Sequence, residues 1–79
     1  MPTVTVLYFA TLREQKGRTE ETINVQVGTT LGALYDDLFP PGPDGVLPVA
    51  FARNREYATR DVVIEDGDEI SFLPPLGGG

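Results

Sequence analysis

The most constraining feature of this chain is a single amphipathic helix signal set among short β-type segments. Gly28, Thr29 and Thr30 supply a break and a hydroxyl N-cap. Apolar residues follow at i, i+3, i+4 and i+7, namely Leu31, Leu34, Tyr35 and Leu38. Pro40 and Pro41 end this pattern, which predicts a helix of about nine residues. A helix with one apolar stripe must bury it against a second layer, so we expect a two-layer domain.

The segments around this helix carry β-strand signals. Residues 3–9 are rich in β-branched and aromatic side chains and are apolar on both faces near their end, which predicts an interior strand. A short helical turn over residues 10–16 precedes residues 21–27, whose alternation predicts a strand with one wet face. Three further extended segments are short: residues 49–53, 62–64 and 69–73. The order indicates an α+β fold, in which a small mixed sheet carries one main helix on one face.

Length and charge restrict the possible functions. A chain of 79 residues makes one domain, and we assign residues 1–75 to it and residues 76–79 to a flexible tail. Six Lys and Arg against twelve Asp and Glu give a net charge of −6, which disfavours nucleic acid as a partner. The acidic balance suits solubility, or docking onto a basic surface of another protein.

The chain contains no cysteine and no histidine. It therefore lacks a disulfide, a thiolate nucleophile, the usual general base and the commonest metal ligand. The apolar run over residues 6–10 is far too short to span a bilayer, and no basic segment precedes it. We expect a soluble, cytoplasmic protein from which most ordinary side-chain catalysis is excluded.

Two clusters of charged residues are candidate functional sites. A turn and a solvated surface, respectively, explain them better. The acidic cluster at residues 65–69 lacks the ligand spacing of an EF-hand loop, so we interpret it as a turn and expect no metal. Arg53, Arg55 and Arg60 form a modest basic group near Tyr57, which we interpret as solvated surface.

The last six residues, Pro74-Pro75-Leu76-Gly77-Gly78-Gly79, are the most unusual part of the sequence. Two prolines favour an extended path, and the glycines that follow are narrow and conformationally free. Such a tail can insert into another protein and present the carboxylate of Gly79, although glycine-rich ends are often only linkers or frayed termini. Tyr57 and Leu73 are equally compatible with core positions and with exposed anchors for a partner.

Several segments together resemble the small subunits of molybdopterin synthase, which are ubiquitin-like β-grasp sulfur carriers. The segments that carry the resemblance are residues 6–10, 12–14, 53–56, 66–70 and 72–79. Most specific is Gly67-Asp68-Glu69 followed by the Pro-Pro-aliphatic-x-Gly-Gly ending. Gly77 stands where this family usually has Ala, Ser or Thr, so Gly78 and Gly79 are the paired glycines of the motif.

The resemblance implies a mechanism centred on Gly79. A ubiquitin-activating-like adenylyltransferase uses ATP to adenylate Gly79, and a donor persulfide then supplies sulfur to make a thiocarboxylate. The tail, Leu76, Gly77 and Gly78, enters the large synthase subunit, and Tyr57, Leu73 and Arg13 serve in docking. The sulfur goes to cyclic pyranopterin monophosphate and builds the molybdopterin dithiolene. No metal and no tightly bound cofactor are expected, and neither is any activity of the isolated chain outside a hetero-oligomer.

Two alternatives stay open. A related sulfur carrier serving thiamin, cysteine or tRNA thiolation would use the same chemistry at Gly79, and only its acceptor enzyme would differ. A ubiquitin-like modifier would instead join Gly79 to protein lysines and produce a ladder of conjugates.

Overall fold

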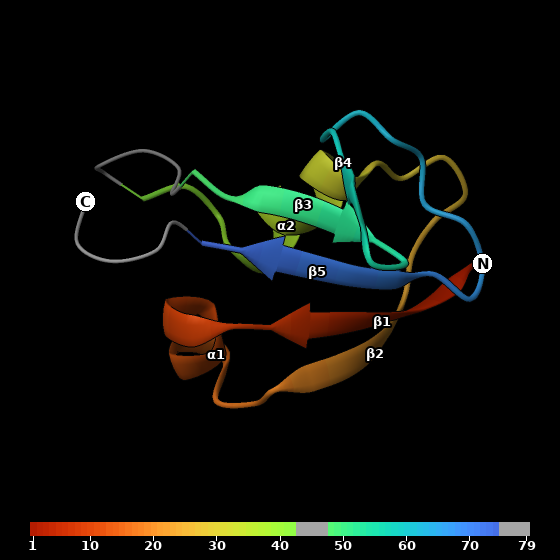
Figure 1. Cartoon of the computed structure of the whole chain (residues 1–79). Coiled ribbons are helices and arrows are strands. Elements are labelled where there is room, and N and C mark those ends of the chain that lie inside the picture. Colours follow the sequence, from red (N-terminus) through yellow and green to blue (C-terminus); the bar gives the residue numbers. More distant parts are fainter. Residues whose placement is uncertain (43–47, 75–79) are drawn as a thin grey trace.

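The computed structural model describes residues 1–42 and 48–74, which form a five-stranded sheet crossed on one face by a helix (Figure 1). In chain order the elements are β1 (Thr3–Tyr8), α1 (Ala10–Lys16), β2 (Glu20–Asn24), α2 (Leu31–Leu38), β3 (Ala50–Arg53), β4 (Glu56–Ala58) and β5 (Glu69–Leu73). The strand order is β2-β1-β5-β3-β4. Strands β1 and β5 run parallel, whereas the other neighbours are antiparallel. This mixed sheet with one main helix is the β-grasp arrangement expected from the resemblance.

The first strand lies in the interior of the sheet, as its two apolar faces predicted. β1 pairs with β2 on one side and with β5 on the other. Its parallel pairing aligns Thr5 with Glu69 and Tyr8 with Phe72, so both strands end at the same edge of the domain. The first and last strands of the domain thus lie side by side in the interior of the sheet.

The predicted helix and its cap are confirmed. The hydroxyl of Thr30 accepts a hydrogen bond from the backbone N–H of Ala33 at 3.1 Å, which satisfies one of the free donors of the first turn. Near the helix end, Arg60 Nη2 donates to Asp36 Oδ2 at 2.8 Å and ties α2 to the segment before β5. The apolar stripe faces the sheet: Leu31, Leu34 and Tyr35 are buried, and Leu38 is half-buried.

The core between α2 and the sheet is rich in aromatic rings. Tyr35 contacts Phe72 on β5 and Phe51 on β3, with ring centroids 5.1 and 5.9 Å apart. The two phenylalanine rings lie 5.7 Å from each other. All three contacts are T-shaped, the geometry that the ring quadrupole favours. Phe72 is fully buried, so this cluster forms the centre of the fold.

The opposite face of the sheet has no helix over it among the described residues, and we call it the open face. Successive side chains of a strand point alternately to the core and to the open face. On β5, Ile70 and Phe72 are buried in the core, while Ser71 and Leu73 are half-buried on the open face. Cross-strand register places the same side of β1, β3 and β4 beside them. The open face includes Thr5, Leu7, Ala52, Tyr57, Ser71 and Leu73.

Besides the end of β1 at Tyr8 instead of residue 9, two expectations about strands were wrong. The second strand ends at Asn24 instead of residue 27, because a turn follows in which Thr29 donates to the carbonyl of Gln26. Val25 still reaches the core, but Val27 is 84% exposed. A short strand, β4, was also not expected, since its three residues are too few to show a clear alternation.

Candidate functional site

Strand β5, the last element before the tail in the sequence, ends beside the end of β1 and the start of α1 (Figure 1). Because Tyr8 pairs with Phe72 in parallel register, Phe9 and Leu73 follow at the same end of neighbouring strands. Pro74 is the last described residue on this path. The predicted tail residues, Leu76, Gly77, Gly78 and Gly79, lie outside the described residues.

Tyr57 and Leu73 come together on the open face, although they are far apart in the sequence. They line a shallow hollow of about 280 Å³ with Ala52, Arg55 and Ser71. Tyr57 is 82% exposed, which excludes the core position that the sequence had left open for it. Leu73 is half-buried and has its side chain on the open face, away from the helix. Their docking role stays a prediction, and both have the placement it requires.

Arg13 lies on α1, close to the tail exit. Its backbone N–H points to the carbonyl of Phe9 at 3.4 Å, so it follows Phe9 by one helical turn. Gly17, at φ 72, caps the helix and donates its N–H to the carbonyl of Arg13 at 2.8 Å. Arg13 is exposed, and its docking role also stays a prediction.

Phe9 is an apolar residue at this end that sequence reasoning placed inside the first strand. In the structure β1 ends at Tyr8, and Phe9 is the N-cap residue of α1 with 40% of its surface exposed. The signal was present in the sequence, because strict alternation puts Phe9 on the face opposite Tyr8. An exposed phenylalanine next to the tail exit extends the candidate docking surface toward α1.

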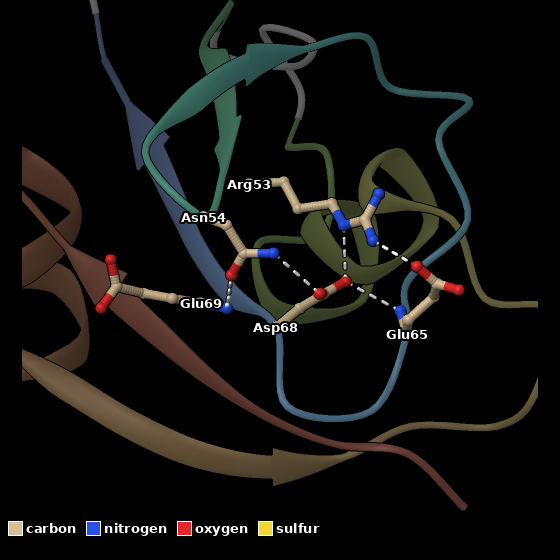
Figure 2. A network of polar contacts seen from close by, with 5 residues as sticks. All are labelled: Arg53, Asn54, Glu65, Asp68 and Glu69. Carbon is tan, nitrogen blue, oxygen red and sulfur yellow. Dashed lines mark hydrogen bonds and ion pairs between the residues drawn. The ribbon is translucent and has the colours of Figure 1, made fainter.

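Arg53, Asn54 and Asp68 form a polar network at the other end of the sheet (Figure 2). Asp68 is 5% exposed and accepts hydrogen bonds from Arg53 Nε at 2.8 Å, Asn54 Nδ2 at 3.0 Å and the Glu65 backbone N–H at 2.8 Å. The Asn54 side chain in turn accepts from the Glu69 N–H at 2.9 Å. Arg53 also pairs with Glu65. The network therefore fastens the β3–β4 turn to the start of β5.

Burial alone would raise the pKa of Asp68, but the hydrogen bonds outweigh it. Donation from the Glu65 N–H, from Asn54 and from Arg53 holds the pKa of this carboxyl below its ordinary value. Asp68 is thus a structural anion and belongs to the turn predicted for residues 65–69. The described residues contain no group of three or more Asp, Glu, His or Cys side chains placed to hold a metal.

The network also fixes the turn that presents Tyr57. Arg53 and Glu56 are opposite each other in the backbone register of β3 and β4. Asn54 and Arg55 therefore form a two-residue loop between the strands. Both have positive φ, 53° and 71°, as a type I′ hairpin turn requires. Asn54 suits its position, whereas Arg55 occupies one that normally favours glycine.

The three arginines predicted as one basic group lie in three different environments. Arg53 binds Asp68 in the network, and Arg60 binds Asp36 on α2, at the side of the sheet opposite the open face. Only Arg55 of these three lines the hollow. The three arginines therefore do not form one basic group, although Arg55 and Arg60 are exposed as predicted.

Comparison with known proteins identifies the family. The sequence profile of the ThiS family matches residues 6–79. The chain belongs to the ThiS family. This member of the family is similar to the molybdopterin synthase sulfur carrier subunit of Mycobacterium tuberculosis, with 40% identity and 96% of each chain covered.

Solved structures of similar proteins support the same fold for this ThiS family member. It resembles a small archaeal modifier protein of H. volcanii, with a TM-score of 0.82, 26% identity, and 96% of this chain and 100% of that chain covered. It also resembles a chain in a complex of subunits 1 and 2 of molybdopterin-converting factor from Helicobacter pylori, with a TM-score of 0.64, 25% identity, and 98% and 99% covered. The ubiquitin-like β-grasp fold is confirmed. No helix in residues 1–42 and 48–74 is long and apolar enough to cross a membrane.

Proposed function

We propose that this protein is the sulfur carrier subunit of a molybdopterin synthase and donates sulfur to a pterin precursor of the molybdenum cofactor. The observation that carries the proposal is the 40% identity, over 96% of the chain, to a molybdopterin synthase sulfur carrier subunit. Membership of the ThiS family over residues 6–79 supports it, because that match includes the whole tail.

The reactive group in this proposal is the carboxylate of Gly79. A carboxylate is a poor electrophile, so an adenylyltransferase first joins it to AMP with release of pyrophosphate from ATP. The terminal sulfur of a donor persulfide displaces AMP, and a thiol then reduces the resulting acyl disulfide to the thiocarboxylate. The chain supplies the acyl group and no catalytic side chain, which agrees with its lack of cysteine and histidine.

The large synthase subunit is the partner in this proposal, and the two-subunit complex from Helicobacter pylori supports it by analogy. Docking through the open face places the tail exit against the partner, since Leu73 lines the hollow and directly precedes Pro74. Tyr57, Leu73 and Arg13 hold the orientation while Leu76, Gly77 and Gly78 enter the partner's active site. Such positioning lowers the entropic cost of the transfer step.

A reconstituted sulfur transfer reaction tests the proposal. The chain, its adenylyltransferase, ATP, a persulfide donor, a reducing thiol and the large subunit are mixed with cyclic pyranopterin monophosphate. Molybdopterin is then measured by fluorescence after oxidation. We expect product with the full chain and none after deletion of Gly79, with unchanged thermal melting. We also expect Gly78→Val to block pyrophosphate exchange, because a β-branched side chain widens the tail. Product formation by the truncated chain contradicts the proposal.

A second candidate, a ubiquitin-like protein modifier, is favoured by the likeness to the small archaeal modifier protein of H. volcanii. It requires an isopeptide bond between Gly79 and a lysine of a target protein. Immunoblotting of host lysate against a tagged chain discriminates the two functions. A ladder that disappears when Gly79 is deleted supports the modifier, whereas a sulfur carrier runs as a single band.

A further inference from the structure

The hollow on the open face has one charged residue in an otherwise uncharged lining. Ala52, Tyr57, Ser71 and Leu73 supply small or apolar surface and two hydroxyls, whereas Arg55 adds a guanidinium. The Arg55 side chain is 88% exposed. A binding partner that fills the hollow must therefore meet this cation.

Arg55 is also poorly engaged within its own chain. Its closest carboxylate among the described residues is that of Glu69, with 3.8 Å between Nε and Oε1, which is beyond hydrogen-bond distance. By contrast, three other arginines each donate a hydrogen bond to a carboxylate: Arg18, Arg53 and Arg60. In a chain of net charge −6, a cation that stays available beside a hollow is a distinctive local feature.

The backbone at Arg55 does not favour arginine. Its φ of 71° lies in the left-handed region, and the second position of a type I′ turn is usually glycine. Among residues 1–42 and 48–74, the guanidinium has only the 3.8 Å approach to Glu69 to offset this conformation. A side chain held at an unfavourable backbone position without a folding role points to a role outside the fold.

We propose that Arg55 is a specificity-determining residue, which pairs with a carboxylate on the large synthase subunit next to an apolar side chain that fills the hollow. This inference rests on the proposed function. The planar guanidinium matches a carboxylate with two parallel hydrogen bonds, which fixes orientation as well as attraction. The occupant is thus an apolar residue flanked by Asp or Glu.

Charge pattern makes this contact selective. The acidic surface of the chain favours a partner that is basic over much of its interface, and a uniformly basic partner is repelled at Arg55. A partner with one carboxylate opposite Arg55 satisfies both requirements. Discrimination thus comes from a repulsive element against wrong partners as well as from the attraction to the right one.

Calorimetric binding to the purified large subunit encoded in the same genome tests the proposal. Four variants are compared with the wild type at two salt concentrations: Arg55→Glu, Arg55→Lys, Arg55→Gly and Arg60→Gln. We expect Arg55→Glu to weaken binding by about tenfold or more and Arg55→Lys by less. Arg60→Gln removes the same charge from the helix side of the sheet and should bind within about twofold of the wild type.

Arg55→Gly separates recognition from folding. Glycine suits the turn, so this variant should melt at or above the wild-type temperature and still bind several-fold more weakly, with a smaller salt dependence. Wild-type affinity of Arg55→Glu, or an increase in its affinity, overturns the inference and leaves the proposed function intact. Failure of the wild type to bind the large subunit overturns the proposed function, and this inference with it.

Discussion

The two faces of the sheet have different roles: the helix face holds the core, and the open face is the candidate docking surface. Neighbouring residues of β5 show the difference. Phe72 points to α2, is fully buried, and contacts the rings of Tyr35 and Phe51. Leu73, the next residue, lies on the open face and lines the hollow with Tyr57. Because the strand alternates, one position sets the stability of the domain and the next is available to a partner.

The difference lies in what covers each face. Over the helix face, α2 buries a continuous aromatic and aliphatic core, and little of it reaches solvent. On the open face, polar residues such as Thr5 and Ser71 lie beside the half-buried Leu7 and Leu73 and the exposed Tyr57. An exposed tyrosine beside a hollow adds nothing to the core, so selection for a partner explains it better than selection for stability.

The largest expected effect belongs to the helix face. Phe72→Ala removes a ring from the centre of the aromatic cluster and leaves a cavity, so the free energy of unfolding should fall by about 3–5 kcal/mol. Ser71→Ala, its neighbour on the open face, should change stability by less than about 0.5 kcal/mol. Urea unfolding followed by circular dichroism measures both. Equal losses of unfolding free energy in the two variants would contradict the claim that the helix face, and not the open face, determines stability.

Asp68 should show the next largest effect, with a defined pH dependence. Asp68→Ala leaves Arg53, Asn54 and the Glu65 N–H without their shared acceptor, so we expect a loss of about 2 kcal/mol at pH 7. The folded-state pKa is lowered, so this contribution is present above the unfolded-state value of about 4.

It is lost as the pH falls through the lower folded-state pKa of Asp68. The stability difference between wild type and Asp68→Ala should therefore shrink in unfolding curves recorded at successively lower pH. A difference that is the same at pH 7 and in strong acid would show that the charge of Asp68 is not what the network uses.

Charge placed on the open face should affect binding and spare the fold. Tyr57→Glu and Leu73→Glu should each weaken binding to the large subunit by roughly 2 kcal/mol, since anchors in a hollow dominate interface energies. Tyr57→Glu should keep the wild-type melting temperature, because the ring is 82% exposed. Ala33→Glu, on the exposed side of α2 and therefore on the other side of the sheet, is the matched control and should bind normally. A large fall in melting temperature would show that these residues contribute to the core and would contradict their role as anchors.

The smallest effect concerns the turn between β3 and β4. Arg55→Gly should raise the free energy of unfolding by up to about 1 kcal/mol, because glycine adopts φ of 71° without steric cost. Asn54→Gly should lower stability, since it deletes hydrogen bonds to Asp68 and from Glu69. Thermal melting of both variants checks the opposite signs. Destabilisation by Arg55→Gly would mean that Arg55 contributes to folding.

The sequence predicted the elements that depend on local pattern. The stripe from Leu31 to Leu38, the cap at Thr30 and the interior position of β1 could all be read from spacing and residue type. β4 could not, because its pairing depends on the turn at Asn54 and on β3 across from it. The roles of residues in the acidic run also depended on the fold, since Asp68 meets Arg53 only after β3 and β5 pair.

The sequence predicted which residues belong to the candidate site better than it predicted how they are arranged in space. Tyr57 and Leu73 were chosen, but no local pattern shows that they share a hollow with Arg55. Phe9 was assigned to a strand because apolar runs do not reveal where a strand ends. Register across the sheet, set by pairing of distant segments, decides these contacts.

The most direct test of sulfur carriage is the intact mass of the chain after incubation with its adenylyltransferase, ATP, a persulfide donor and a reducing thiol. We expect a shift equal to the exchange of one oxygen for one sulfur, located by fragmentation at Gly79. We also expect the shift to reverse when the large subunit and cyclic pyranopterin monophosphate are added. An unchanged mass in the presence of an active adenylyltransferase would contradict the assignment of this chain as a sulfur carrier.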